Sequence, residues 1–413
     1  MPDHYEITED SHITFHTLAR GEEEDGFILV GRQDIASYVS IPAEAREIID
    51  MLDSGMTVGE VKEILEEKYG EEVEVCDFIE SMAVNEMVKS IDSVEIPTTS
   101  PVQKGLFMGI TQKHVGWLYS TYAKGVYSAA AVVCLVIFAV YPKYIPRPID
   151  YFFHPLYSVA VLFMFFFSWI FVAIHELAHL CAAKSVGVEG TFSLSTRTIF
   201  VVAQTNLSNL WAVPRNNRYI VYLAGMAWDT MIILFSLVLI LLTDFEMIAL
   251  PDLWYNFLKA IVFIKVWGVI WQFRFNMQTD IYYVFSNYFR CRNLLGDTKT
   301  YIKNFLSRFI KRIEKTDLSD MPEQEMRVLT VYTPFYIGGS LLIVVTFFLR
   351  DLPIFLLIVK RAIDGITAGY VTNPAGFIDA VVLIGSTAFN YGLLGYLTLK
   401  SRLDSINTKS GLH

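Results

Sequence analysis

Six long apolar segments constrain the fold of this 413-residue chain more than any other feature of its sequence. Each has about 20 predominantly apolar residues, the length that an α-helix needs to cross the hydrocarbon core of a bilayer. Only 18% of the residues are charged, against roughly 25% in a typical soluble domain. The sequence therefore predicts an α-helical polytopic membrane protein with about six transmembrane helices. The predicted spans lie near 123–141, 156–183, 219–242, 254–275, 331–349 and 377–399.

Charge divides the chain into an acidic N-terminal part and a mildly basic remainder. Residues 1–100 carry 25 acidic and 6 basic side chains, a net charge of −19, whereas the whole chain has a net charge of −10. This contrast predicts a water-soluble acidic domain attached to a membrane domain. The expected parts are an acidic domain over 1–95, a linker and interfacial segment over 96–122, a membrane core over 123–290, a basic loop over 291–330, and C-terminal transmembrane helices with a tail over 331–413.

The N-terminal part has the pattern of a small α+β domain. The expected elements are strands over 14–18 and 27–30, a turn-rich segment over 20–26, and helices over 41–53, 57–70 and 75–87. Thr57 and Glu60 have the spacing of a capping box, and Gly70 suits a helix C-terminus. A strongly acidic domain is a poor DNA binder because phosphate binding needs a basic surface, so no nucleic-acid partner is expected.

Basic residues predict the orientation in the bilayer. Nine Lys and Arg residues lie between Arg290 and Arg327, after the fourth predicted span. By the positive-inside rule this loop is cytoplasmic, and an even number of spans puts both termini on the same side. The acidic start of the chain does not have the pattern of a secretory signal, which agrees with cytoplasmic N- and C-termini. The expected location is the plasma membrane.

The second predicted span contains the motif His175-Glu176-Leu177-Ala178-His179. Residues four apart share a helix face, so both imidazoles can bind one cation, and Glu176 lies beside them to activate water as a general base. Ionisable residues inside a membrane helix are costly, which favours a functional role. The motif therefore predicts a hydrolytic site with Zn²⁺ as its cofactor. The alternative is that the histidines form hydrogen bonds between helices, or that this end of the span lies among the lipid headgroups.

A catalytic zinc needs a third protein ligand while keeping one position for water. Two aspartates compete for that role: Asp280, in a polar break after the fourth span, and Asp229, inside the third span. Asp229 can alternatively orient a histidine, and Asn276 is a further candidate for either role. The sequence does not give the distance from either aspartate to the histidines. Between the second and third spans, alternation over 192–196 and β-branched residues over 199–203 predict a β-hairpin or a re-entrant sheet beside the site, whose edge can bind an extended peptide.

The histidine motif and the later segment from Asn276 to Asp280 resemble the site-2 protease family of intramembrane metallopeptidases. The chain is more similar to the branch of peptide zinc metalloproteases, where an Ala-Gly-Met stretch follows the histidines and two tyrosines follow the aspartate. The corresponding residues here are Ala224-Gly225-Met226 and Tyr282-Tyr283. The resemblance implies a zinc endopeptidase with His175, His179 and Asp280 as metal ligands and Glu176 as general base, and it favours Asp280 over Asp229. The chain departs from the family pattern at Met277, where Pro is frequent, and at Ile281, where Gly is usual.

Residues 27–92 separately resemble the PqqD-like domains that recognise leader peptides. The similarity is carried by Phe27-Ile28-Leu29-Val30, Ile41, Ala45, Ile48-Ile49, the turn from Asp53 to Val58, Phe78-Ile79 and Met82. It implies a winged-helix-like fold that accepts a peptide as an added strand. The expected partners are then a peptide or leader-peptide substrate, the lipid bilayer, and a peptide-modifying enzyme or exporter.

Together these features predict intramembrane cleavage of a peptide or membrane-associated substrate during maturation of a ribosomally made peptide. Two alternatives remain open: regulated intramembrane proteolysis of a signalling protein, and a non-catalytic subunit for peptide export. A structural zinc site usually has four protein ligands, so the ligand set bears on the second alternative.

Overall fold

The computed structural model describes residues 7–24, 26–35, 37–100, 109–188, 191–197, 200–206, 209–210, 213–291, 293–310, 315–316, 321 and 323–410. The predicted linker over 96–122 and the basic loop over 291–330 therefore lie partly outside the described residues. The chain divides into two compact units. Unit 1 comprises Met1–Trp117, Leu180–Ser193 and Thr205–Val221, and unit 2 comprises Leu118–His179, Leu194–Gln204 and Tyr222–His413.

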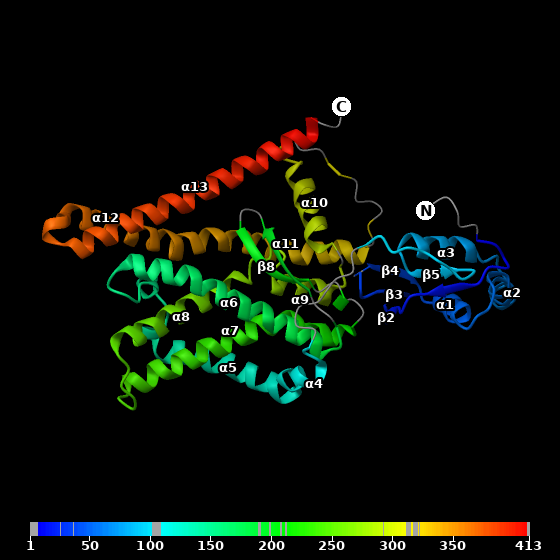
Figure 1. Ribbon diagram of the computed structural model, residues 1–413, viewed down its shortest axis with the longest axis horizontal. Coiled ribbons are helices and arrows are strands. Elements are labelled where there is room, and N and C mark those ends of the chain that lie inside the picture. Colours follow the sequence, from blue (N-terminus) through cyan, green and yellow to red (C-terminus); the bar gives the residue numbers. More distant parts are fainter. Residues whose placement is uncertain are drawn as a thin grey trace. The chain divides into compact units, whose positions relative to one another are not determined.

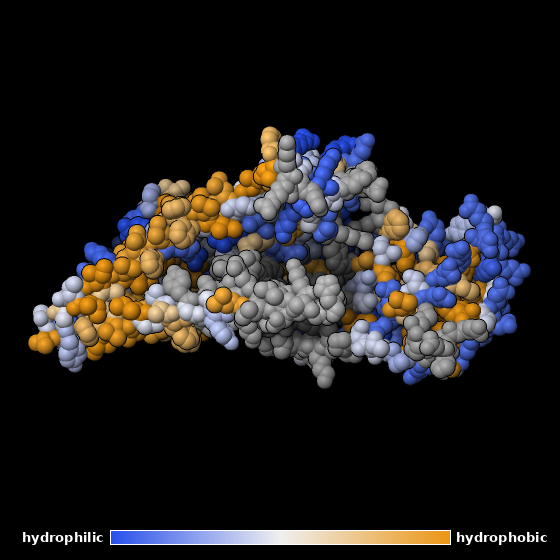
Figure 2. All heavy atoms as spheres, turned by 90° about the horizontal axis from the view of Figure 1, so that it is seen from above, coloured by the Kyte–Doolittle hydropathy of each residue, from blue (hydrophilic) through white to orange (hydrophobic). Residues whose placement is uncertain are grey.

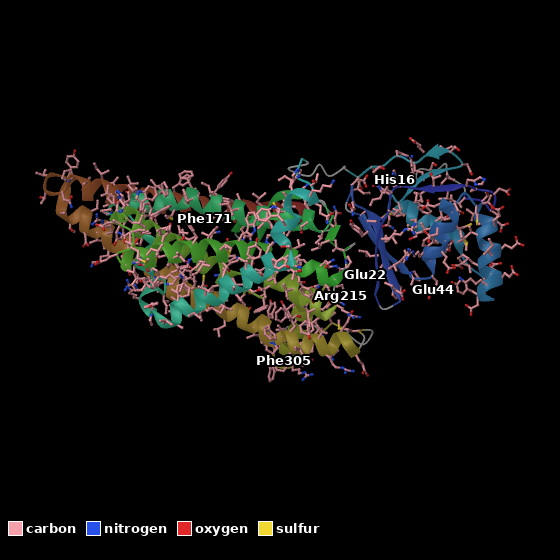
Figure 3. The ribbon with its side chains drawn as sticks, turned by 90° about the horizontal axis from the view of Figure 1, so that it is seen from below. His16, Glu22, Glu44, Phe171, Arg215 and Phe305 are labelled. Atoms are coloured by element: carbon pink, nitrogen blue, oxygen red, sulfur yellow. The ribbon has the colours of Figure 1, made fainter. Side chains whose placement is uncertain are left out.

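The N-terminal domain of unit 1 contains two small antiparallel sheets and three helices. One sheet has the order β1 (Ile13–Phe15), β5 (Val88–Ile91) and β6 (Val94–Glu95), and the other has the order β2 (Ala19–Glu24), β3 (Phe27–Arg32) and β4 (Ser37–Pro42). The helices are α1 (Ala45–Asp53), α2 (Val58–Tyr69) and α3 (Val75–Val84). Apolar residues from all three helices and from strands β1, β3 and β5 form one buried core. This domain includes His16 and Glu44, labelled in Figure 3.

The helices of this domain agree with the sequence better than the strands do. The capping box is confirmed: the Glu60 N–H donates to Thr57 Oγ1 at 3.2 Å, and the Thr57 N–H donates to Glu60 Oε2 at 2.9 Å. Gly70 ends α2 with a φ of 72°, where a residue without Cβ is favoured. The prediction of a turn-rich segment over 20–26 was wrong, because most of it belongs to β2. β2 is an edge strand of its sheet. Edge strands often carry charged residues, so a polar composition does not exclude a strand there.

Among the described residues, five helical segments are long and apolar enough to cross a membrane, which is consistent with an integral membrane protein. Four of them are α5 (Thr121–Val140), α6 (Tyr157–Ser185), α7 (Arg215–Asp244) and α8 (Asp252–Trp271), close to the first four predicted spans. Many of their large apolar side chains are exposed, including Leu135, Phe166 and Phe235. Hydrophobic residues also cover much of the surface of the helical part of the molecule that is visible in Figure 2. A contiguous apolar surface of this extent needs a lipid or protein environment.

The fifth segment differs from its prediction. The span predicted over 331–349 continues through α11 (Glu323–Thr346), a π-helical turn (Phe347–Asp351) and α12 (Leu352–Thr372). In the sequence, the charged residues Arg350 and Asp351 and the helix-breaking Pro353 indicate that the span ends near residue 349. Pro353 nevertheless lies at the start of α12, directly after the π-helical turn, and the helix continues past it. The sixth predicted span lies in α13 (Pro374–Ser410), which folds back on α12 after Asn373 (Figure 1).

Shorter elements connect these helices. They are α4 (Gln112–Val115), three 3-10 turns at Gly116–Tyr119, Pro142–Tyr144 and Pro148–Tyr151, strands β7 (Thr191–Arg197) and β8 (Phe200–Asn206), α9 (Asp280–Phe289) and α10 (Leu294–Leu306). Strands β7 and β8 form a two-stranded sheet, which confirms that β-structure lies between the second and third predicted spans.

Candidate metal centre

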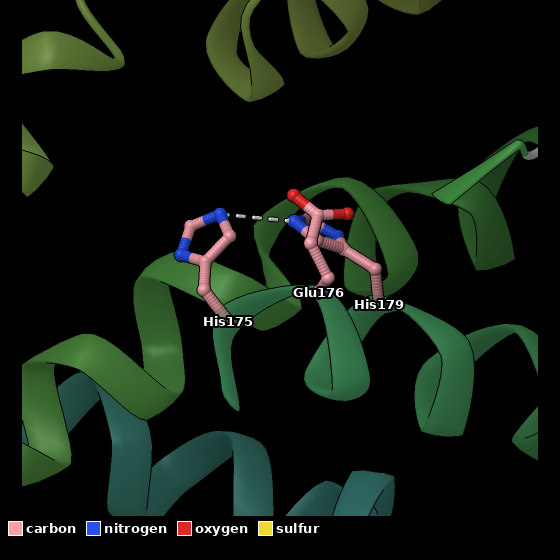
Figure 4. A group of neighbouring side chains, drawn as sticks. All are labelled: His175, Glu176 and His179. Carbon is pink, nitrogen blue, oxygen red and sulfur yellow. Dashed lines mark hydrogen bonds between the residues drawn. The ribbon is translucent and has the colours of Figure 1, made fainter. Parts of the chain in front are cut away.

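The two histidines of the motif lie on one face of α6, as their spacing predicts. His175 is 8% exposed and His179 is 4% exposed, so both rings are removed from solvent. Their Nε2 atoms are 3.2 Å apart, and Figure 4 shows the two rings meeting through these atoms. The rings therefore converge on one point between them.

Asp280 reaches the same point from another element. It is the first residue of α9, and its Oδ2 lies 3.0 Å from His175 Nε2 and 3.3 Å from His179 Nε2. The preceding turn is anchored to Gln272 at the end of α8. The Asp280 N–H donates to Gln272 Oε1 at 3.1 Å, and Thr279 Oγ1 donates to the Gln272 carbonyl at 2.7 Å. These bonds fix where α9 begins and hence where the carboxylate points.

The three converging atoms have the spacing of metal ligands. Nε2 of His175, Nε2 of His179 and Oδ2 of Asp280 form a triangle with sides of 3.2, 3.0 and 3.3 Å. Ligand atoms of a tetrahedral zinc, each about 2.0–2.1 Å from the ion, are about 3.3 Å from one another. The residues present thus fit zinc as three ligands, with a fourth position left for water.

Asp229 of α7 contacts the other side of His175. Its Oδ2 lies 2.9 Å from His175 Nδ1. A carboxylate only accepts hydrogen bonds, so an Nδ1 proton donated to Asp229 would leave the Nε2 lone pair free for a metal shared with Asp280 and His179. Asp229 therefore sits where it can orient the His175 imidazole, whereas Asp280 sits where a third ligand would.

Glu176 lies next to the convergence point without being part of the triangle. One carboxylate oxygen and the two ring nitrogens all lie within 4.8 Å of one another. Figure 4 shows the carboxylate of Glu176 on the same side of α6 as both rings. Its side chain is only half-buried.

The His175 ring packs directly against Gly225 of α7, where a side chain would clash with it. A Cβ at this position would lie 2.4 Å from both Cε1 and Nε2 of the His175 ring, too close for any side chain. The glycine thus has a steric function that the sequence indicates only through the Ala-Gly-Met resemblance. Asn276, another candidate, makes no hydrogen bond to either histidine among the described residues, and its Oδ1 is buried without a partner there.

Lys265 was missed by the sequence prediction. It lies on α8, is 3% exposed, and its Nζ forms an ion pair with Asp229 Oδ1. A single lysine in the apolar run from Ile261 to Trp271 is the kind of signal that marks a functional residue in a membrane helix. The strands β7 and β8 were expected near the site, but their side chains lie outside what the structure describes.

No family model, curated protein or solved structure matches this chain.

Proposed function

We propose that the protein is an intramembrane zinc-dependent endopeptidase that hydrolyses a peptide bond in a peptide or membrane-associated substrate. One observation carries the proposal: two imidazole nitrogens from α6 and a carboxylate oxygen from α9 converge at zinc-ligand spacing, with Glu176 beside them. The convergence lies on a helix that is long and apolar enough to cross a membrane. Neither helix packing nor interhelical hydrogen bonding requires three such groups to meet at one point.

The charges around this point also favour a divalent cation. Glu176, Asp229 and Asp280 bring three carboxylates, and Lys265 brings one ammonium group that contacts Asp229. With neutral imidazoles, the formal charges of these four residues sum to −2. Carboxylates gathered in an apolar environment favour a bound cation, so the cluster suits an ion of charge +2.

Each residue of the site has its own role in the proposed hydrolysis. His175, His179 and Asp280 would hold the zinc, which would polarise the scissile carbonyl of the substrate and lower the pKa of a water molecule. Glu176 takes a proton from the attacking water and returns it to the leaving amine. Asp229 holds the His175 ring in the tautomer with a free Nε2 lone pair, and Asp280 completes the ligand set.

The remainder of the chain is proposed to deliver substrate. The acidic N-terminal domain, with its PqqD-like pattern, would capture a peptide or leader peptide on a sheet edge at β2 or β4, as in maturation of a ribosomally made peptide. With cytoplasmic termini, α6 runs from outside to inside. His175 lies ten residues before the end of α6 at Ser185, about 15 Å at 1.5 Å per residue. Cleavage would then occur within the membrane, towards its cytoplasmic face.

The test uses the full-length protein in detergent, with its zinc content measured by mass spectrometry and its activity followed on fluorescein-labelled casein in micelles. The wild type should hold one zinc and cleave casein, and Glu176→Gln should keep zinc while losing about 10²–10⁴-fold in rate, the usual contribution of a general base. Zinc binding without cleavage in both proteins would favour the export-subunit alternative. Undiminished cleavage by Glu176→Gln would contradict the assigned base.

A further inference from the structure

Lys265 is the buried cation of this centre, and the proposed hydrolysis gives it no role. Its ammonium group forms an ion pair with Asp229 Oδ1 and donates to the Phe171 carbonyl at 3.3 Å. The same nitrogen lies 4.7 Å from the centroid of the Phe171 ring. Phe171, labelled in Figure 3, lies on α6 one helical turn before His175. Lys265 thus links the helix of the proposed ligands to the helix of Asp229.

Stability alone does not account for a lysine at this position. Burying an ion pair costs desolvation that its Coulomb attraction often fails to offset, and apolar replacements are frequently as stable. In a membrane helix an ionisable residue carries a further cost, which favours a functional explanation. The two oxygens of Asp229 support one, because Oδ1 contacts Lys265 while Oδ2 accepts from His175 Nδ1.

We infer that Lys265 is a positioning residue for the zinc site: it holds the Asp229 carboxylate in the orientation that fixes His175 and supplies the positive charge that Asp229 requires. This inference rests on the proposed function. The resulting chain of contacts runs from Lys265 on α8 through Asp229 on α7 to His175 on α6. Partners behind a metal-bound histidine typically change metal affinity by about 10–100-fold when they are lost.

If Lys265 positions Asp229, substitutions of these two residues should not have additive effects on zinc affinity. This non-additivity distinguishes a positioning role from a packing role. Asp229→Asn removes the carboxylate but leaves the positive charge of Lys265 unpaired near the cation site. Adding Lys265→Met removes that charge and returns the cluster to the net charge of the wild type. If Lys265 were only a packing residue, the second substitution would add damage to the first.

The experiment measures zinc affinity by chelator competition on the full-length protein in detergent. We expect Asp229→Asn to bind zinc about 10–100-fold more weakly than the wild type. Asp229→Asn/Lys265→Met should bind it about tenfold more tightly than Asp229→Asn, since one unit charge at this range has an effect of that order. Equal or weaker binding by the double variant would overturn the inference.

Lys259 provides a matched control on the same helix. It forms an ion pair with Asp150 at 2.6 Å, and Asp150 is buried, but neither residue contacts the histidines or their partners in the described structure. Lys259→Met should leave zinc affinity within about twofold of the wild type. A loss as large as that of Asp229→Asn would show that removing any buried ion pair disturbs the site, and would count against a specific role for Lys265.

Thermal unfolding of the metal-free proteins keeps the inference testable if a variant folds poorly. The double variant should unfold at a higher temperature than Asp229→Asn or Lys265→Met, because each single variant leaves one buried charge unpaired. If the double variant is the least stable of the three, the residues do not act as a pair and the inference fails. A wild type without zinc affinity would instead defeat the proposed function itself.

Discussion

The acidic N-terminal domain and the candidate metal centre use charge in opposite ways. In the N-terminal domain charged residues are abundant and many of their ion pairs lie at the surface, such as Lys68 with Glu47, whose side chains are 48% and 39% exposed. At the metal centre charged residues are few, and Asp229 and Lys265 are almost fully buried and contact each other. Exposed pairs contribute little to stability, whereas a buried charge without its partner is strongly unfavourable. A single charge is therefore informative about function where charges are rare.

The largest effect should come from the proposed third ligand. Asp280→Asn keeps the shape of the side chain but removes its negative charge, so the protein should lose stoichiometric zinc, as measured by mass spectrometry after purification. Asp252→Asn is the matched control, because Asp252 is an exposed aspartate that also lies in the first turn of a helix. If Asp280→Asn retains zinc as fully as Asp252→Asn, the ligand assignment is wrong and the contrast between the two regions weakens.

The second effect is steric and concerns Gly225. Gly225→Ala places a methyl group 2.4 Å from the His175 ring, which must move. We expect a loss of about 1–3 kcal/mol in stability, typical of overpacking, together with weaker zinc binding in a chelator titration.

Gly268→Ala is the control for this substitution. Gly268 also lies in a membrane helix, but its nearest atom to an added Cβ is Asp229 Oδ2 at 4.0 Å, an ordinary contact. This variant should bind zinc like the wild type. Equal effects of the two alanines would mean that the close packing around His175 has no special importance.

The smallest effects belong to the acidic domain. Thr57→Ala removes the cap of α2 and should destabilise that helix by about 1 kcal/mol. Lys68→Ala removes an exposed ion pair and should destabilise the domain less than Thr57→Ala does. Hydrogen–deuterium exchange of the α2 amides in the full-length protein measures both. A larger loss for Lys68→Ala than for Thr57→Ala would contradict the view that surface charge in this domain contributes little.

Local patterns in the sequence predict much of this molecule. The spacing of His175 and His179 fixes their common face because helix geometry is regular, and Thr57 with Glu60 fixes the start of α2 for the same reason. Spans one to four follow from apolar length alone. Each of these features depends on residues within about one or two turns of one another.

Features that depend on contacts between distant segments could not be predicted from local sequence patterns. The roles of Asp229 and Asp280 were left open by the residues themselves, since only the packing of α6, α7 and α9 decides which ring nitrogen each carboxylate faces. Strand β2 was missed because its pairing with β3, rather than its polar composition, makes it a strand. Lys265 is informative only once its partner on another helix is known.

X-ray absorption spectroscopy of the purified, zinc-loaded wild type tests the central claim most directly. We predict four nitrogen or oxygen neighbours about 2.0–2.1 Å from zinc, including two imidazoles, with no sulfur, and the loss of one oxygen neighbour or of the metal itself in Asp280→Asn. A protein that binds no zinc, or that holds it through sulfur or through a site unaffected by His175→Ala and His179→Ala, would contradict the account.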